Sequence, residues 1–165
     1  MMNENDVVDL LKKAENIAVD VWIDGGWGVD ALVGHQTRPH NDIDIFIQKK
    51  DSTEFTEMLS SIGYRETNMD YTTDDHTAWR DQYDRTIDLH LFEFTGVGTV
   101  QFENEHYPAN VLNGKGTIGG MTVRCLTAEA QLLYHQGYEH KEKDRHDVLL
   151  LCETFNLSTP EEYRL

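Results

Sequence analysis

The sequence predicts an α+β fold in a single domain. A chain of 165 residues with 39% apolar positions is of ordinary size for one domain with a buried core. Apolar residues recur at helical spacings of three and four near the N-terminus, whereas they alternate with polar residues over 43–47 and 86–94. Helices and strands are therefore both expected in one compact unit.

The first third of the chain predicts helices and strands in turn. Val7, Leu10, Leu11 and Ala14 share one helical face. Gly34 ends a short helix. The expected elements are a helix at 5–18, a strand at 21–23, a helix at 28–33, a strand at 43–47 and a helix that begins at Asp51 or Ser52 and buries Phe55, Met58, Leu59 and Ile62.

The remainder of the chain predicts three further strands, a glycine-rich segment and two helices. The strands are expected at 64–69, 77–80 and 86–94, and the segment 95–125 is expected to hold short strands or a hairpin that ends in a strand at 121–125. A helix is predicted over 127–138 and a last helix from about 143 to 155, with Val148, Leu149, Leu151, Cys152 and Phe155 facing inward.

The charge balance excludes several classes of protein. Asp and Glu total 30 against 14 Lys and Arg, a formal charge of −16, which disfavours nucleic acid and anionic membranes as partners. No apolar run approaches the roughly 18 residues of a membrane span, and the N-terminus does not resemble a signal peptide. A cytoplasmic protein is expected. Cys125 and Cys152 lack metal-ligand spacing and are predicted to be buried thiols.

The segment Asp42-Ile43-Asp44-Ile45-Phe46-Ile47 is the most informative one for function. The strand period of two places Asp42 and Asp44 on one face and the three isoleucines on the other. Two adjacent carboxylates repel each other unless a cation lies between them, and oxygen ligands suit Mg²⁺. The alternative is that both carboxylates form the solvated face of an edge strand.

A third carboxylate stands on the strand at 86–94. Asp88 shares a polar face with His90, while Ile87, Leu89 and Leu91 share the other face. Phosphoryl-transfer sites commonly hold two Mg²⁺ ions about 4 Å apart, bridged by carboxylates. The alternative for Asp88 is an ion pair with Arg80 or Arg85.

Gly25 and Gly26 lie between the predicted strand at 21–23 and the helix at 28–33. Glycines in such a turn let backbone N–H groups approach a phosphate closely, although the segment matches neither the P-loop nor the dinucleotide fingerprint. His40 and His90 flank the aspartates, and either ring is a candidate for the same cleft.

These segments together resemble the signature of the antibiotic nucleotidyltransferases. The resemblance rests on Gly25 to Asp30, Gly34, Thr37 to His40 and Asn41 to Ile45. Within that group the chain is most similar to the short lincosamide nucleotidyltransferases, and it is similar to the aminoglycoside 2″-nucleotidyltransferases.

The resemblance implies a nucleotidyltransferase fold, with a mixed, twisted sheet flanked by helices. It implies one domain over 1–165, in which about 1–125 form the catalytic sheet and helices and about 126–165 form C-terminal helices that close a cleft. It further implies transfer of AMP from ATP to a hydroxyl of a lincosamide such as lincomycin or clindamycin, with release of pyrophosphate.

The resemblance also implies roles for individual residues. Asp42 and Asp44 would hold Mg²⁺, as two ions, and Asp88 would be a metal ligand, the base that accepts the hydroxyl proton, or both. Contacts with the nucleotide phosphates are implied for Gly25, Gly26, Arg38 and Lys143.

Other interpretations share part of this pattern. The acceptor is an aminoglycoside in one of them, and in another the chain is a toxin–antitoxin nucleotidyltransferase that modifies a protein or RNA. A DxD glycosyltransferase and a non-catalytic acidic interaction module are further alternatives. An aromatic wall suited to a lincosamide is suggested by Trp79, Tyr83, Phe92, Phe94, Phe102 and Tyr107. The sequence does not indicate an oligomeric state.

Overall fold

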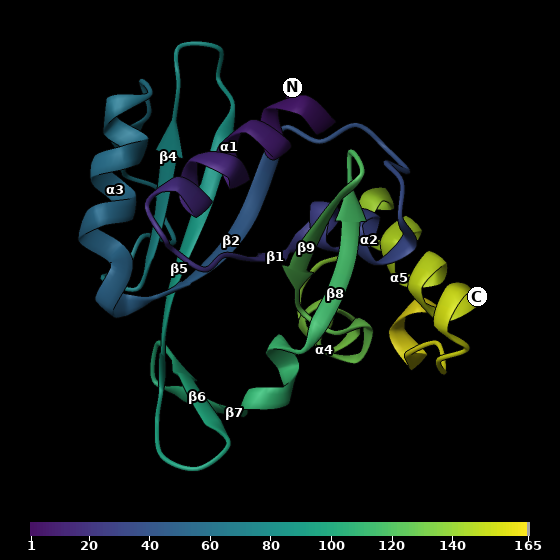
Figure 1. Ribbon diagram of the computed structural model, residues 1–165. Helices are drawn as coiled ribbons and strands as arrows, with labels where there is room; N and C mark the ends of the chain where they lie inside the picture. Colours follow the sequence, from purple (N-terminus) through teal and green to yellow (C-terminus); the bar gives the residue numbers. More distant parts are fainter. Residues whose placement is uncertain (165) are drawn as a thin grey trace.

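One mixed sheet with the strand order β3-β4-β5-β2-β1-β9-β8 forms the centre of the computed structural model, which describes residues 1–164 (Figure 1). The hairpin β6–β7 extends from β5. The strands are β1 (Trp22–Asp24), β2 (Asp42–Gln48), β3 (Arg65–Thr67), β4 (His76–Arg80), β5 (Thr86–Phe94), β6 (Thr99–Phe102), β7 (Glu105–Pro108), β8 (Gly114–Ile118) and β9 (Met121–Cys125). The helices are α1 (Glu4–Asn16), α2 (Gly25–Val33), α3 (Ser52–Ser61), α4 (Ala128–Tyr134) and α5 (Glu142–Phe155).

The sheet combines parallel and antiparallel neighbours. β2 runs parallel to β5 and β1 runs parallel to β9, whereas β1 and β2 are antiparallel. A parallel pair needs a long connection, and the chain between β2 and β5 supplies it with α3, β3 and β4. The predicted α+β class and the mixed sheet are confirmed.

The two faces of the central strands differ sharply. Ile43, Ile45 and Ile47 of β2 and Ile87 and Leu89 of β5 are at most 1% exposed on one face. Leu10 and Leu11 of α1 and Phe55 and Leu59 of α3 belong to the same apolar cluster. Burial of these side chains stabilises the sheet and leaves its second face for polar residues.

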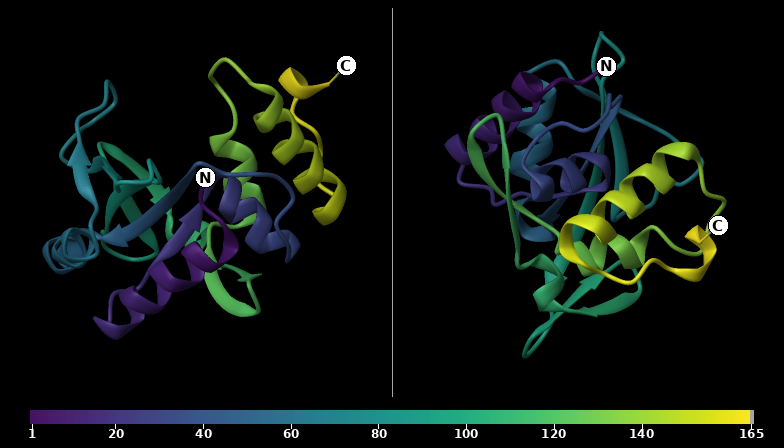
Figure 2. Two further views of the ribbon diagram at one scale, coloured as in Figure 1. Left: turned by 90° about the horizontal axis from the view of Figure 1, so that it is seen from above. Right: turned by 90° about the vertical axis from the view of Figure 1, so that its right-hand side faces the viewer.

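The helices lie on both sides of the sheet. α1 and α3 lie together on one side, and α4 and α5 lie on the other, next to α2 (Figure 2). α2 follows β1 directly, and α4 follows β9 after a short connection. The C-terminal helices therefore stand near the point where β1 ends.

Several predicted details are wrong. α2 begins at Gly25 rather than 28, so the two glycines form its first turn. α4 ends at Tyr134 rather than 138, because the chain turns at Gly137 with φ of +86°. Three apolar side chains predicted to be buried are partly exposed, namely Ile62, Leu149 and Phe155. The predicted helix at 5–18 ends at Asn16, so Ile17 and Ala18 lie beyond it.

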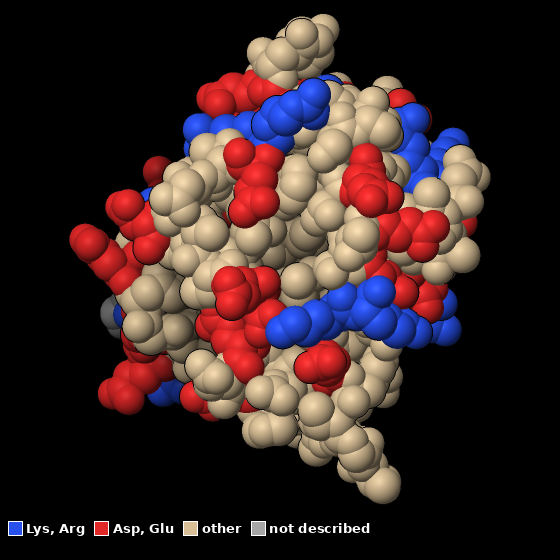
Figure 3. Space-filling model, turned by 90° about the vertical axis from the view of Figure 1, so that its left-hand side faces the viewer, with Lys and Arg blue, Asp and Glu red and all other residues tan. Residues whose placement is uncertain are grey.

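The surface is rich in carboxylates, as the composition requires. Acidic side chains lie in several groups around a hollow in the face seen in Figure 3, with basic side chains between them. Among residues 1–164, no helix is both long enough and apolar enough to cross a membrane. Cys125 and Cys152 are both buried and free, as predicted.

Candidate active site

Three aspartates lie side by side on the polar face of the sheet. The register pairs Asp24 of β1 with Asp44 of β2, and Asp44 with Asp88 of β5. Asp42 lies on the same face, two residues before Asp44 and opposite Thr86. The strand of Asp88 is therefore the direct neighbour of the strand that carries Asp42 and Asp44.

Asp24 is a site residue that the sequence interpretation did not include. Asp24 directly precedes the two glycines in the sequence. The antiparallel pairing of β1 with β2 brings it beside Asp44. The strand at 21–23 was predicted, but strand pairing is not encoded in a three-residue apolar run.

A cavity of about 220 Å³ lies in front of these carboxylates. Two groups of residues face each other across it. The sheet, the first turn of α2 and the α2–β2 connection contribute Asp24, Gly25, Gly26, Arg38, Asp42, Asp44 and His90, and the C-terminal part contributes Tyr134, His135, Tyr138, Lys143 and Asp144. Six predicted site residues thus line one cavity, and Asp88 adjoins it through its pairing with Asp44.

The carboxylates of Asp24 and Asp44 have unequal proton affinities. Burial, together with the charge of Asp44, raises the pKa of Asp24 from 3.8 to about 6. Burial also favours the neutral form of Asp44, but His90 and Lys143 outweigh that effect and lower its pKa. The side chains of His90 and Asp44 are 3.6 Å apart between Nε2 and Oδ1. Asp44 is therefore the more strongly ionised of the two.

Asp88 is more buried than its neighbours. It is 8% exposed, and burial raises its pKa above the ordinary value. The charges of Asp44 and Asp42 act in the same direction, whereas the hydroxyl of Tyr71, which donates to Oδ1 at 2.6 Å, opposes them. A carboxylate with raised proton affinity is suited to accept a proton.

The raised pKa of Asp24 predicts a pH-dependent stability. The folded protein binds this proton more tightly than the unfolded chain, so the contribution is complete below pH 3.8 and is lost as the pH rises through about 6. Asp24→Asn is expected to increase the free energy of unfolding at pH 7.5 by roughly 1–3 kcal/mol in metal-free buffer. Urea unfolding at pH 4.5 and 7.5 measures this, and a less stable variant at pH 7.5 would contradict it.

Gly25 and Gly26 lack a Cβ atom, and other side chains of the site therefore lie directly against their backbone. Gly25 has φ of +59°, and a Cβ atom there would overlap the carboxylate of Asp44. A Cβ atom on Gly26 would overlap the side chains of Arg38 and His40. The glycines therefore keep the DxD carboxylate and Arg38 next to the N-terminus of α2.

Arg38 is held by a buried carboxylate. Its Nε and Nη2 atoms donate to Asp147 of α5 at 2.8 and 2.5 Å, and Nη1 lies 3.1 Å from His40 Nδ1. His40 in turn lies 2.5 Å from Asp30 and is 2% exposed. His40 therefore supports this network and does not line the cavity, whereas His90, the other candidate histidine, does.

The Arg38–Asp147 pair predicts a large loss of stability when it is broken. Asp147 is 1% exposed at its side chain, so Asp147→Asn leaves the Arg38 guanidinium without its charged partner. We expect the free energy of unfolding to fall by about 3 kcal/mol. Asp20→Asn is the control, because its pair with Arg124 is half exposed and should contribute about 1 kcal/mol or less. Equal effects of both variants would contradict the prediction.

The predicted aromatic wall is not present as one surface. Trp79 lies opposite Ile87 on the helix-covered face, Phe92 is buried in a second apolar cluster, and Tyr83 lies in the β4–β5 turn. The rings near Asp44 and Asp88 form another group, to which Phe102 of the predicted wall belongs. Tyr71 stacks on His76 and His90 stacks on Phe46, the rings of His76 and His90 are tilted against each other, and these centroid distances are 4.1–4.7 Å. Phe102 meets His90 edge to face.

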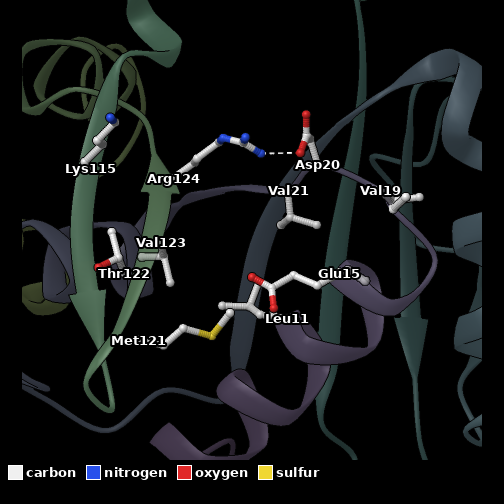
Figure 4. Close-up of a pocket in the computed structure, with 12 residues that line it drawn as sticks. Leu11, Glu15, Val19, Asp20, Val21, Lys115, Met121, Thr122, Val123 and Arg124 are labelled. Carbon is white, nitrogen blue, oxygen red and sulfur yellow. Dashed lines mark hydrogen bonds and ion pairs between the residues drawn. The ribbon is translucent and has the colours of Figure 1, made fainter.

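A second, larger cavity lies elsewhere in the molecule. It has a volume of about 480 Å³ and lies between the end of α1 and the hairpin β8–β9 (Figure 4). Leu11, Val21, Met121 and Val123 contribute apolar surface, and Arg124 reaches across toward Asp20. None of the predicted site residues lines this larger cavity. The smaller cavity, which six of them line, is therefore the candidate active site.

The carboxylates of the site fit a hard cation. Asp24 and Asp44 are like charges on paired residues, and oxygen donors suit Mg²⁺. Within residues 1–164, no three His, Cys, Asp or Glu side chains are grouped as a ready metal site. Because Mg²⁺ is usually held by one or two carboxylates, waters and substrate phosphates, the donor set fits a cation that binds together with a nucleotide.

The chain is similar to proteins that modify antibiotics. Residues 6–151 match the family described as aminoglycoside-2″-adenylyltransferase. A lincosamide resistance protein from Staphylococcus haemolyticus is 28% identical over 151 residues, which are 89% of this chain and 92% of that protein. A 2″-aminoglycoside nucleotidyltransferase from Klebsiella pneumoniae is 36% identical over 63 residues, which are 38% of this chain and 36% of that protein.

Solved structures extend the similarity to the whole fold. The lincomycin-bound lincosamide antibiotic adenylyltransferase LnuA superimposes with a TM-score of 0.81 at 27% identity, over 95% of this chain and 99% of that chain. The enzyme ANT(2″)-Ia in complex with adenylyl-2″-tobramycin gives a TM-score of 0.77 at 22% identity, over 92% and 88% of the two chains. The predicted nucleotidyltransferase fold is confirmed.

Proposed function

The chain belongs to the aminoglycoside-2″-adenylyltransferase family, and we propose that it transfers AMP from ATP to a hydroxyl of a lincosamide, with release of pyrophosphate. The observation that carries the lincosamide as acceptor is the similarity to LnuA over nearly the full length of both chains. The similarity to the Staphylococcus haemolyticus lincosamide resistance protein over 89% of this chain supports the same acceptor.

The residues predicted from the resemblance have the following roles in this proposal. Asp42 and Asp44 would hold Mg²⁺, as two ions, and the nucleotide phosphates would complete the coordination. Asp88 would be the base that accepts the hydroxyl proton, a further metal ligand, or both. When bound, the ions neutralise charge on the triphosphate. Arg38 and Lys143 line the cavity and balance the remaining negative charge, and the backbone of Gly25 and Gly26 at the N-terminus of α2 faces the phosphates.

In the proposed reaction one bond to the α-phosphorus forms, one breaks, and Asp88 accepts the proton that is released. The drug hydroxyl oxygen forms a bond to the α-phosphorus, and the bond from that phosphorus to the pyrophosphate oxygen breaks. The hydroxyl proton passes to the carboxylate of Asp88, whose burial raises its pKa. Acidic groups around the cavity also suit a drug that carries a positive charge near neutral pH.

The acceptor can be identified directly. The purified chain is incubated with ATP and Mg²⁺ and either lincomycin, clindamycin or gentamicin, and products are identified by mass spectrometry with pyrophosphate release measured in parallel. We expect AMP adducts of the two lincosamides. An adduct of gentamicin alone would support the aminoglycoside alternative, which the family match favours, and the absence of any adduct would contradict the proposed function.

A further inference from the structure

A tyrosine outside the predicted site contacts the proposed base. The hydroxyl of Tyr71 donates a hydrogen bond to Oδ1 of Asp88 at 2.6 Å. In the part of the chain that the structure describes, no other side chain donates a hydrogen bond to this carboxylate. Asp88 is 8% exposed, so the orientation of its buried carboxylate depends on that one donor.

The segment that carries Tyr71 is fastened to the sheet. It connects β3 to β4, and its Asp75 carbonyl accepts from the Leu91 amide of β5 at 2.8 Å. The Asp75 side chain accepts from Lys49 at 2.6 Å, and Thr73 donates to Glu103 at 3.1 Å. The hydroxyl of Tyr71 is therefore presented by an anchored loop.

The Tyr71 ring is held by stacking. It lies against the His76 ring at a centroid distance of 4.7 Å, and His76 lies against His90 at 4.1 Å. His90 is the residue whose Nε2 atom lies 3.6 Å from Asp44. A continuous series of ring contacts thus joins Tyr71, the partner of Asp88, to His90, the partner of Asp44.

We propose that Tyr71 is a positioning residue, whose hydroxyl holds Oδ1 of Asp88 so that Oδ2 is left to accept the proton of the drug hydroxyl. This inference rests on the proposed function. Tyr71 is 42% exposed, so its ring adds little to the core, and the hydroxyl is the group that touches the site. A carboxylate with one oxygen fixed is preorganised for proton transfer, which lowers the barrier of that step without changing nucleotide binding.

The test is Tyr71→Phe, which removes the hydroxyl and retains the ring. We expect kcat for AMP transfer to lincomycin to fall about tenfold, while KM for ATP stays unchanged, because the lost hydrogen bond orients the proton acceptor and the Tyr71 hydroxyl does not line the cavity. Tyr83→Phe is the matched control. Tyr83 is 67% exposed in the β4–β5 turn, and that variant should keep the wild-type kcat.

The outcomes are distinguishable. A fall in kcat at constant KM in Tyr71→Phe alone supports the positioning role, provided that urea unfolding shows equal stability for both variants. A wild-type kcat in Tyr71→Phe, or a change confined to KM for ATP, overturns it. A wild-type enzyme that transfers AMP to no drug overturns the proposed function, and the role of Tyr71 falls with it.

Discussion

Asp88→Asn is expected to lower the turnover number for AMP transfer by about 10²–10⁴, while lincomycin and ATP still bind. Asparagine keeps the shape of the side chain and one oxygen, but it does not accept the proton of the drug hydroxyl. The hydrogen bond from Tyr71 can persist to the amide oxygen. Single-turnover kinetics measure the chemical step, and calorimetry with each ligand measures binding. Asp84→Asn is the control, because Asp84 is 85% exposed at its side chain in the β4–β5 turn.

The same variant separates the two roles proposed for Asp88. If Asp88 acts only as the base, Asp88→Asn lowers the rate and added Mg²⁺ does not restore it. If Asp88 is also a metal ligand, Asp88→Asn also weakens the binding of ATP with Mg²⁺, and a higher metal concentration restores part of the rate. A wild-type rate would remove Asp88 from the mechanism. His90 would then be the next residue to test, because it shares the face of Asp88, whereas Glu93 points to the other face.

Chelation of divalent cations is expected to abolish transfer altogether. The carboxylates of Asp42 and Asp44 face the cavity with Asp24 beside them, and these negative charges repel a nucleotide triphosphate unless a cation is bound. Activity with EDTA should be restored by excess Mg²⁺ or Mn²⁺, because both accept oxygen ligands in octahedral geometry. Circular dichroism with and without EDTA controls for unfolding. Undiminished transfer in EDTA would contradict metal dependence.

The face pattern of the central strands could be predicted because it depends on local periodicity alone. Alternation along 42–47 and 86–94 separates the aspartates from the isoleucines and leucines whatever the neighbouring strands are. The buried isoleucines of β2 confirm it. The cleft residues Arg38 and Lys143 were found by resemblance, because Arg38 lies in an irregular connection and the periodicity of the helix that carries Lys143 does not indicate a ligand.

Asp24 and Tyr71 could not be found in the same way. Asp24 reaches the site through the register of β1 with β2, which is a long-range pairing. Tyr71 lies in an irregular connection between two short strands, so no period gives the direction of its side chain. The end of α4 was missed for a related reason, since helical spacing continues past Tyr134 although the chain turns at Gly137.

The short strand β1 is completed in the sheet only by a strand that is synthesised about 100 residues later. All three of its residues pair with β2 on one side, and Trp22 and Ile23 pair with Arg124 and Cys125 of β9 on the other. On the ribosome, β1 therefore lacks its second neighbour until Cys125 has emerged, and the wall formed by α5 follows later still. Sheets with such distant pairings fold more slowly than those with local ones. The cavity in front of the aspartates is completed only after the first turn of α5 has been synthesised, so shorter translation products carry the three aspartates without a closed site.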